Sequence, residues 1–511
     1  AFWQSPAIPE APGLKAVEMF DAVADGRIRA LWIICTNPAV SMPDADRVAA
    51  AIAGCDFVVV SDMIENTDTT RLAHVLLPAT GWAEKDGTVT NSERRISRQR
   101  RVLPAPGQAR DDWRILADVA ARMGWGQAFG WADAAAVFAE YAALSGLAGQ
   151  LGSDFDISAL AGITPDEYEA LAPFTWPRSA KRQGGRFFAD GRFHTPSGKA
   201  RMLPITPRAP VAALDPDHPF RLNTGRARDH WHTMTRTGLS PRLSQHLAEP
   251  YLEIHPADAG ALGLAPASLA QLSSPQGSAV LRVLITDRTR RGAVFAPIHW
   301  TGETAPSGRI DALVASVVDP VSGQPESKAA AVAIAPYAAR WYGFAVSATA
   351  FRPDCGYWAA APLRQGMRAE LAGTETPDDW EAYARTLFAL PAGAEALVMA
   401  DRTRGMVRLA FALNGKVIAA LFVAPDPVAL ARGHLASLLG AAPDATTLAG
   451  RPGADRPDPG AIVCSCFDVG VNQIVAAITG QGLITVEALG TALRAGTNCG
   501  SCRPELRGLI G

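Results

Sequence analysis

Four cysteines near the end of the sequence constrain the fold more tightly than any other feature. Cys464 and Cys466 are one residue apart, and Cys499 and Cys502, two residues apart, follow after 32 further residues that are predicted to form two helices. Structural zinc usually takes pairs spaced by two to four residues, whereas a one-residue gap presents both sulfurs from one tight turn, which favours a cluster of two irons. A zinc knot and a pair of disulfides are the alternatives.

Length and charge exclude several classes of protein. A chain of 511 residues is expected to form several domains, and a net charge of −2 favours neither nucleic acid nor an anionic membrane. No apolar run approaches the roughly 18 residues that a transmembrane helix needs. We therefore expect a cytoplasmic protein without nucleic-acid or membrane partners. A disulfide framework is not expected, because such frameworks belong to short secreted chains.

The pattern along the chain predicts a multidomain fold that combines α/β parts with a β-barrel. Apolar runs alternate with helical stretches over residues 30–80, as in a doubly wound parallel sheet. Short β-rich runs over 217–335 indicate a β-barrel, and a smaller α+β unit follows, in which Asn414-Gly415 predicts a hairpin. The predicted divisions are an α/β part at 1–215, the barrel at 216–335, the α+β unit at 341–440, a linker at 441–460 and a small helical cysteine domain at 461–511.

Polar residues follow the first two predicted strands of the parallel sheet. Ligands bind outside the carboxyl ends of such strands, so Asn37, Ser61 and Asp62 are site candidates. Cys35 and Cys55 fall inside the sheet pattern, where a structural core role is expected.

Two polar strings stand out. The first runs from Trp82 to Arg101 and is rich in arginine; it is either a solvated charged face or a loop that offers amides and guanidinium groups to a phosphate-bearing ligand. The second, Thr224 to Thr233, follows an apolar strand and reads TGRARDHWHT. Its Gly permits close backbone approach and its Arg, His and Thr side chains supply donors, which favours anion binding over a two-histidine metal site.

These strings resemble known families. Residues 463–509 are similar to the 2Fe-2S domain of bacterioferritin-associated ferredoxin. The first 335 residues resemble molybdopterin oxidoreductases that carry a bis-guanine-dinucleotide cofactor, on the strings TNPAVSMPDADRV, VVVSD, AHVLLPATGWAEKDGTVTNSERR and TGRARDHWHTMTRTG. The version GTVTNSERRISRQR, combined with the cysteine domain, looks most like the catalytic subunit of bacterial assimilatory nitrate reductases.

The resemblance implies roles for particular residues. Asn37, Ser61 and Asp62 would contact one guanine dinucleotide, and Lys85 and Asp112 would lie near the pterin and its phosphates. The residues expected to wrap the second dinucleotide are Thr224, Gly225, Arg226, His230, Trp231, His232 and Thr233. His299 would lie at the rim of the active-site funnel, although a satisfied buried histidine is the default for that residue type, and Lys328 would make a late cofactor contact. Asp311 stands where relatives often carry Asn, which puts its contact in doubt.

The resemblance also implies a function. A molybdenum-bis-molybdopterin guanine dinucleotide would reduce nitrate to nitrite, with electrons arriving from ferredoxin or a flavoprotein or NADH-linked reductase through the 2Fe-2S cluster and a 4Fe-4S cluster. The family places that 4Fe-4S cluster and the molybdenum ligand in an N-terminal region that this sequence lacks. We therefore expect a C-terminal fragment that is inactive alone, with its catalytic residues unassigned. The rivals are another molybdopterin enzyme, such as formate dehydrogenase, and a non-catalytic electron-transfer or cofactor-binding module.

Overall fold

The first unit of the protein is built on a three-stranded parallel sheet with the order β1-β2-β3. The computed structural model describes residues 2–5 and 8–511. Apolar side chains from alternate strand positions, such as Val58 and Val60, pack with Phe20 and Ile52 of two helices into one core. The strands and helices are β1 (Ala30–Ile34), β2 (Phe57–Asp62), β3 (Val75–Pro78), α1 (Ala16–Ala24), α2 (Pro38–Ser41) and α3 (Ala45–Ala53).

A second, antiparallel sheet and a helical layer complete this unit. The arginine-rich string forms the β4–β5 hairpin, and Ile96 on it packs with Phe138 and Tyr168 of the helices. Lys85, in this string, pairs with Asp112, which also bonds Cys35 just beyond β1, so the string lies next to the parallel sheet. The elements are β4 (Gly87–Thr90), β5 (Arg95–Gln99), β6 (Phe174–Thr175), α4 (Asp112–Arg122), α5 (Ala134–Gln150) and α6 (Pro165–Glu169).

The middle of the chain forms a closed six-stranded barrel with the order β10-β8-β11-β7-β12-β9. Its interior is apolar, and Leu222, Leu252, Leu272 and Leu281 are fully buried there. The barrel predicted from the sequence is therefore confirmed. Its elements are β7 (Phe220–Gly225), β8 (Tyr251–Ile254), α7 (Pro256–Ala261), β9 (Leu269–Ser273), β10 (Ser278–Ile285), β11 (Ala293–Pro297) and β12 (Ala330–Pro336).

A six-stranded antiparallel sheet with the order β14-β15-β13-β18-β17-β16 follows the barrel. Asn414 and Gly415 form the predicted hairpin turn, both with positive φ (51° and 71°). The predicted linker contains a short helix, α10, that packs on the sheet. The elements are β13 (Trp341–Ser347), β14 (Tyr357–Pro362), β15 (Met367–Gly373), α8 (Trp380–Leu387), β16 (Glu395–Asp401), β17 (Met406–Leu413), β18 (Lys416–Ala424), α9 (Arg432–Ser437) and α10 (Ala445–Ala449).

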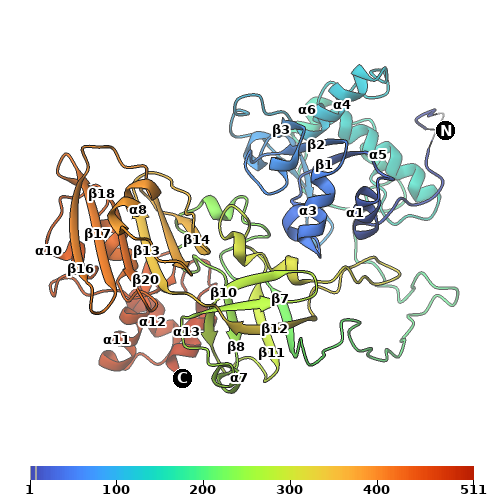
Figure 1. The fold of residues 1–511 in the computed structure, drawn as a ribbon. Coiled ribbons are helices and arrows are strands. Elements are labelled where there is room, and N and C mark those ends of the chain that lie inside the picture. Colours follow the sequence, from blue (N-terminus) through green and yellow to red (C-terminus); the bar gives the residue numbers. More distant parts are fainter. Residues whose placement is uncertain (1, 6–7) are drawn as a thin grey trace.

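The last fifty residues form a small helical unit, which we call the cysteine module (residues 462–511). Its core contains the fully buried side chains Ile474, Leu489 and Leu506. It lies against the barrel and the six-stranded sheet (Figure 1). Its elements are β19 (Ile462–Cys464), β20 (Val469–Gly470), α11 (Val471–Gln481), α12 (Val486–Leu493) and α13 (Arg503–Ile510).

Among the described residues, no single helix is both long and apolar enough to cross a bilayer, whereas α11 and α12 reach that length and composition together, with a bend of 111° between them.

Candidate functional site

Ionisable side chains gather at the carboxyl edge of the parallel sheet. Lys85 Nζ lies 2.9 Å from Asp112 Oδ2, and Asp112 Oδ1 accepts a hydrogen bond from the Cys35 thiol. Asp62 ends β2, and one of its oxygens accepts from the Ile64 amide at 3.1 Å. Burial raises the pKa of Asp62, and the nearby Asp112 charge raises it further, while its hydrogen bonds oppose the shift. Asp62, Lys85 and Asp112, which were predicted from separate parts of the sequence, thus lie at the same edge of the parallel sheet.

Cys35 is where the sequence interpretation was wrong. Cys55 is buried as expected, but Cys35 is exposed at the end of β1, in the left-handed region with φ 58°. Partial burial and the Asp112 carboxylate raise the pKa of the Cys35 thiol to about 11, so it stays protonated at neutral pH. The residue is the first one beyond the strand, and the apolar run that precedes it gave no sign of that boundary.

Asn37 and Ser61 are buried and already hydrogen-bonded within the protein. Asn37 Oδ1 accepts from the Thr69 hydroxyl at 2.6 Å, and its Nδ2 donates to Thr233 Oγ1 at 3.2 Å. Ser61 Oγ accepts from the indole of Trp32 at 2.9 Å. Asn37 therefore joins the α/β unit to the second polar string, rather than standing free at the edge.

The arginines of the first polar string are mostly engaged by protein groups. Arg98 is almost fully buried and pairs with Asp86 and Glu169, and Arg101 pairs with Asp111. Arg94 stacks on Phe187 at 4.3 Å. These guanidinium groups hold the hairpin in place, so Lys85 is the cation of this string that lies at the sheet edge.

The second polar string, the Thr224–Thr233 segment, divides into buried and exposed members. Thr224, Gly225, His230 and Thr233 are buried, whereas the exposed members are Arg226, Trp231 and His232. The Arg226 guanidinium lies 4.7 Å from the centre of the Trp231 ring. A cation and two flat rings on the surface suit a ligand that combines a planar base with negative charge.

His299 fixes the shape of this segment from beneath. It is fully buried; its Nε2 accepts from the Ala227 amide at 2.8 Å, and its Nδ1 donates to the carbonyl of His232 at 2.7 Å. Burial lowers its pKa, which keeps the ring neutral, as one donor and one acceptor nitrogen require. Both ring nitrogens of His299 are thus occupied by backbone groups of the Thr224–Thr233 segment, and its place at the rim of a funnel stays a prediction from the resemblance.

Lys328 and Asp311 lie behind the start of the same segment. Lys328 Nζ donates to the carbonyl of Thr224 at 2.5 Å, and the Thr224 hydroxyl donates to the carbonyl of Ser327 at 2.6 Å. Burial raises the pKa of Asp311 to about 7, although Lys328 opposes the shift. A protonated carboxyl has a donor and an acceptor, as an Asn amide has, so Asp311 can take the place of that amide near neutral pH.

The four cysteines of the cysteine module come together as two pairs. Cys466 Sγ lies 3.4 Å from Cys499 Sγ, and the Cys464 thiol lies beside that of Cys502. Cys464 and Cys502 are buried, and Cys499 is exposed. All are free thiols, and no group of three or more His, Cys, Asp or Glu side chains in the described part of the chain is arranged around one ion. Two pairs suit two irons with two cysteines each.

The electrostatic setting differs between the two pairs. The Ser501 hydroxyl lies 3.1 Å from Cys499 Sγ, and this hydrogen bond lowers the pKa of Cys499. Burial, with the adjacent Cys464, raises the pKa of Cys502 to about 11. The pair that contains Cys499 faces solvent, and the other pair faces the protein interior.

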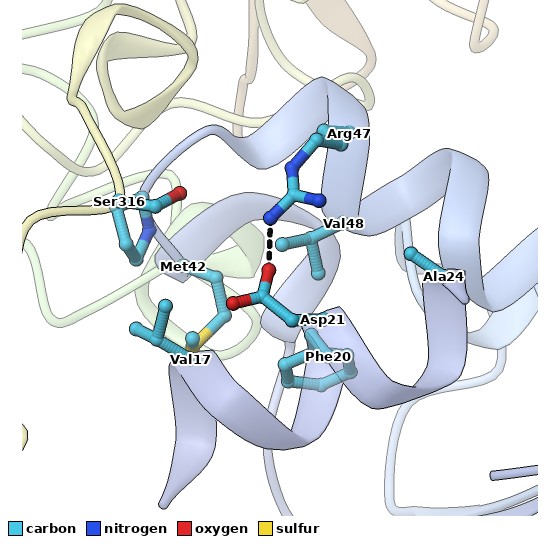
Figure 2. Close-up of a pocket in the computed structure, with 9 residues that line it drawn as sticks. Val17, Phe20, Asp21, Ala24, Met42, Arg47, Val48 and Ser316 are labelled. Carbon is cyan, nitrogen blue, oxygen red and sulfur yellow. Dashed lines mark hydrogen bonds and ion pairs between the residues drawn. The ribbon is translucent and has the colours of Figure 1, made fainter. Parts of the chain in front are cut away.

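A small hollow of about 10 Å³ lies elsewhere, between α1 and α3 (Figure 2). Val17, Phe20 and Val48 line it, and Arg47 forms an ion pair with Asp21 across it. Its charged groups satisfy each other, and none of the residues singled out from the sequence takes part.

Three family models match the chain. Residues 7–122 match the molybdopterin oxidoreductase model, residues 220–331 the molybdopterin dinucleotide binding domain, and residues 462–511 the BFD-like 2Fe-2S binding domain. The first match contains the sheet edge, the second contains the Thr224–Thr233 segment, and the third contains all four clustered cysteines.

Curated relatives are similar over long stretches. A nitrate reductase of Klebsiella oxytoca is 42% identical over all of this chain and 58% of its own length. The assimilatory nitrate reductase catalytic subunit of Bacillus subtilis is 33% identical over 63% of this chain and 44% of its own length. The F420-dependent formate dehydrogenase subunit alpha of Methanocaldococcus jannaschii is 33% identical over 65% of this chain and 46% of its own length. The chain thus spans about half the length of these relatives, and it belongs to the molybdopterin oxidoreductases, with a BFD-like 2Fe-2S domain in its last fifty residues.

Proposed function

We propose that the protein reduces nitrate to nitrite in nitrate assimilation. The observation that carries this proposal is the 42% identity with the Klebsiella nitrate reductase, which extends through the barrel and the cysteine module. In the reaction nitrate takes up two electrons and two protons and yields nitrite and water. A bound molybdenum cofactor supplies the change of oxidation state, while the protein binds and orients it.

The residues of the two polar surfaces fit a molybdenum-bis-molybdopterin guanine dinucleotide. At the sheet edge, Asp62 can accept hydrogen bonds from a guanine edge, and Lys85, held by Asp112, offers a cation to the pterin phosphates. On the barrel, Arg226 and Trp231 offer a cation and a ring to the second dinucleotide.

The buried residues of the barrel site act on its shape. His299 and Lys328 hold the backbone of the Thr224–Thr233 segment from the inside. Their role is therefore to position the exposed side chains. A segment that is already held in place needs little rearrangement when the ligand binds.

Electrons reach the cofactor through the 2Fe-2S cluster held by Cys464, Cys466, Cys499 and Cys502. The exposed Cys499 side of the cluster is the entry point for a donor, which we take to be a cytoplasmic ferredoxin or a flavoprotein or NADH-linked reductase. By similarity, a 4Fe-4S cluster takes part as well.

A second candidate is formate oxidation, because the chain is also 33% identical with a formate dehydrogenase subunit. The two are separated by assaying the anaerobically purified holoenzyme with viologen dyes. Nitrate reductase activity predicts nitrite from nitrate and reduced viologen, and no reduction of oxidised viologen by formate. Formate-dependent dye reduction without nitrite formation contradicts the proposal.

A further inference from the structure

One arginine of the Thr224–Thr233 segment, Arg228, makes two contacts with the cysteine module. Arg228 Nη2 donates to Glu505 Oε2 at 2.9 Å and to the carbonyl of Val463, and only 17% of the Arg228 side chain is exposed. The red helices of the module lie beside the yellow-green strands of the barrel (Figure 1). Charge-assisted bonds of this kind are stronger than neutral ones, and partial burial protects them from screening by salt.

The two partners that Arg228 has in the module belong to the two chain segments that carry the buried thiols. Val463 directly precedes Cys464, and Glu505 lies one turn beyond Cys502, in α13. One guanidinium therefore holds both segments at once. A shift of Arg228 would move the inner pair of cysteines together, and with it the position of the cluster.

His246 and Asp229 lie next to the contact between Arg228 and Glu505. His246 Nε2 lies 3.0 Å from Glu505 Oε1, and its Nδ1 lies 3.7 Å from Asp229 Oδ2. Burial raises the pKa of Glu505, but His246 and Arg228 outweigh that effect and hold it below its usual value. Glu505 is thus an anion in this interface.

The other end of the link is the surface proposed to bind the dinucleotide. Arg228 is two residues from the exposed Arg226 and directly follows Ala227, whose amide is fixed by His299. A further ion pair between the module and the rest of the chain, Arg364 with Asp468, is 3.1 Å long but largely exposed, so it contributes little.

We propose that Arg228 is a positioning residue for electron transfer: it docks the cysteine module on the dinucleotide-binding segment and thereby fixes the path by which an electron leaves the reduced 2Fe-2S cluster for the molybdenum cofactor. The cluster loses one electron in each transfer, and two transfers serve each nitrate. This inference rests on the proposed function and adds the residue that orients its electron donor.

The test compares Arg228→Ala, Arg228→Lys and Glu505→Gln in the holoenzyme, with Arg364→Ala as the matched control that breaks the exposed ion pair of the same module. Iron content is measured first. The cluster is then reduced, nitrate is added, and the decay of the reduced-cluster electron paramagnetic resonance signal is followed. The midpoint potential of the cluster and amide hydrogen exchange in α13 are measured in parallel.

We expect the Arg228→Ala variant to keep its iron. Its reduced cluster should be reoxidised by nitrate about tenfold more slowly, because the loss of one charge-assisted bond shifts the docking equilibrium of the module by about that factor. Loss of the positive charge makes the midpoint potential more negative, whereas loss of the Glu505 charge makes it more positive. Lysine restores part of the rate, and the Arg364 variant behaves like the wild type.

Wild-type potential, reoxidation and α13 exchange in Arg228→Ala would overturn the inference. If Arg228→Ala loses its iron, Glu505→Gln is used in its place. Its midpoint potential is expected to shift in the positive direction, opposite to that of Arg228→Ala, and unfolding does not account for such a shift. If the wild-type protein does not reduce nitrate, the proposed function fails, and the potentials and the exchange of α13 still decide whether Arg228 docks the module.

Discussion

Asn37 Nδ2 lies 3.2 Å from Thr233 Oγ1, so a single amide at the end of β1 reaches the segment that follows β7. The same amide accepts from the Thr69 hydroxyl, and both bonds are buried. This contact joins the two surfaces that are proposed to hold the cofactor, which are nearly two hundred residues apart in sequence.

Asn37→Ala should lower both thermal stability and molybdenum content. Removal of the amide leaves the buried hydroxyls of Thr69 and Thr233 without this partner, at a cost of about 1–3 kcal/mol. Thermal unfolding and metal analysis of the purified holoenzyme check the prediction, with the exposed Gln108→Ala as control. A variant that matches the control in both measurements would show that the bond is dispensable.

Arg226→Ala should lower cofactor occupancy without unfolding the barrel. The Arg226 side chain is exposed and stacks on Trp231, so its loss removes a charge-assisted contact worth on the order of 1.5–3 kcal/mol to the ligand and little else. Molybdenum content per protein is the measurement. Arg290→Ala, an exposed arginine on the loop between β10 and β11, is the control and should retain full occupancy. Equal molybdenum in the two variants counts against the assignment.

Asp311→Asn should stabilise the protein at pH 8 and have little effect near pH 4. The folded pKa of Asp311, about 7, lies above the unfolded value, so the folded state binds more protons between these limits and the wild type loses stability as pH rises through this window. The asparagine variant escapes that loss, on the order of 2–4 kcal/mol. Thermal midpoints at both pH values test this, with the exposed Asp217→Asn as control; a gain that does not grow with pH contradicts the assigned pKa.

Serine at each of Cys464, Cys466, Cys499 and Cys502 should abolish or strongly reduce the visible absorption of the 2Fe-2S cluster. A cluster of this kind is held by four cysteine thiolates, so the loss of any one leaves an iron without a ligand. Iron and sulfide analysis of the holoenzyme checks this, and Cys355→Ser, outside the module, should keep the full complement. Stoichiometric zinc with no iron in the wild type would support the zinc alternative instead.

Local patterns predicted much of the fold. Asn414-Gly415 specified its hairpin because both residues tolerate positive φ, and the strand ends of the parallel sheet carried Asp62 to the expected edge. The spacing of the four cysteines likewise predicted their grouping, because one short turn carries Cys464 and Cys466 and the start of a helix carries Cys502 close to Cys499.

Contacts between distant segments were not predictable from the sequence. The two hydrogen-bond partners of His299 depend on the loop that folds over it, and the exposure of Cys35 depends on where β1 stops. Arg228 gave no local sign that it would face the cysteine module, because its partners lie more than two hundred residues away.

The central claim is that nitrate draws electrons from the 2Fe-2S cluster. The most direct measurement is the electron paramagnetic resonance signal of the reduced cluster in anaerobic holoenzyme, followed after addition of nitrate or of formate, with nitrite determined in the same sample. The account predicts that nitrate abolishes the signal and yields one nitrite for every two electrons removed, while formate generates no signal in the oxidised protein. A reduced signal that persists in excess nitrate, together with its appearance on addition of formate, would contradict it.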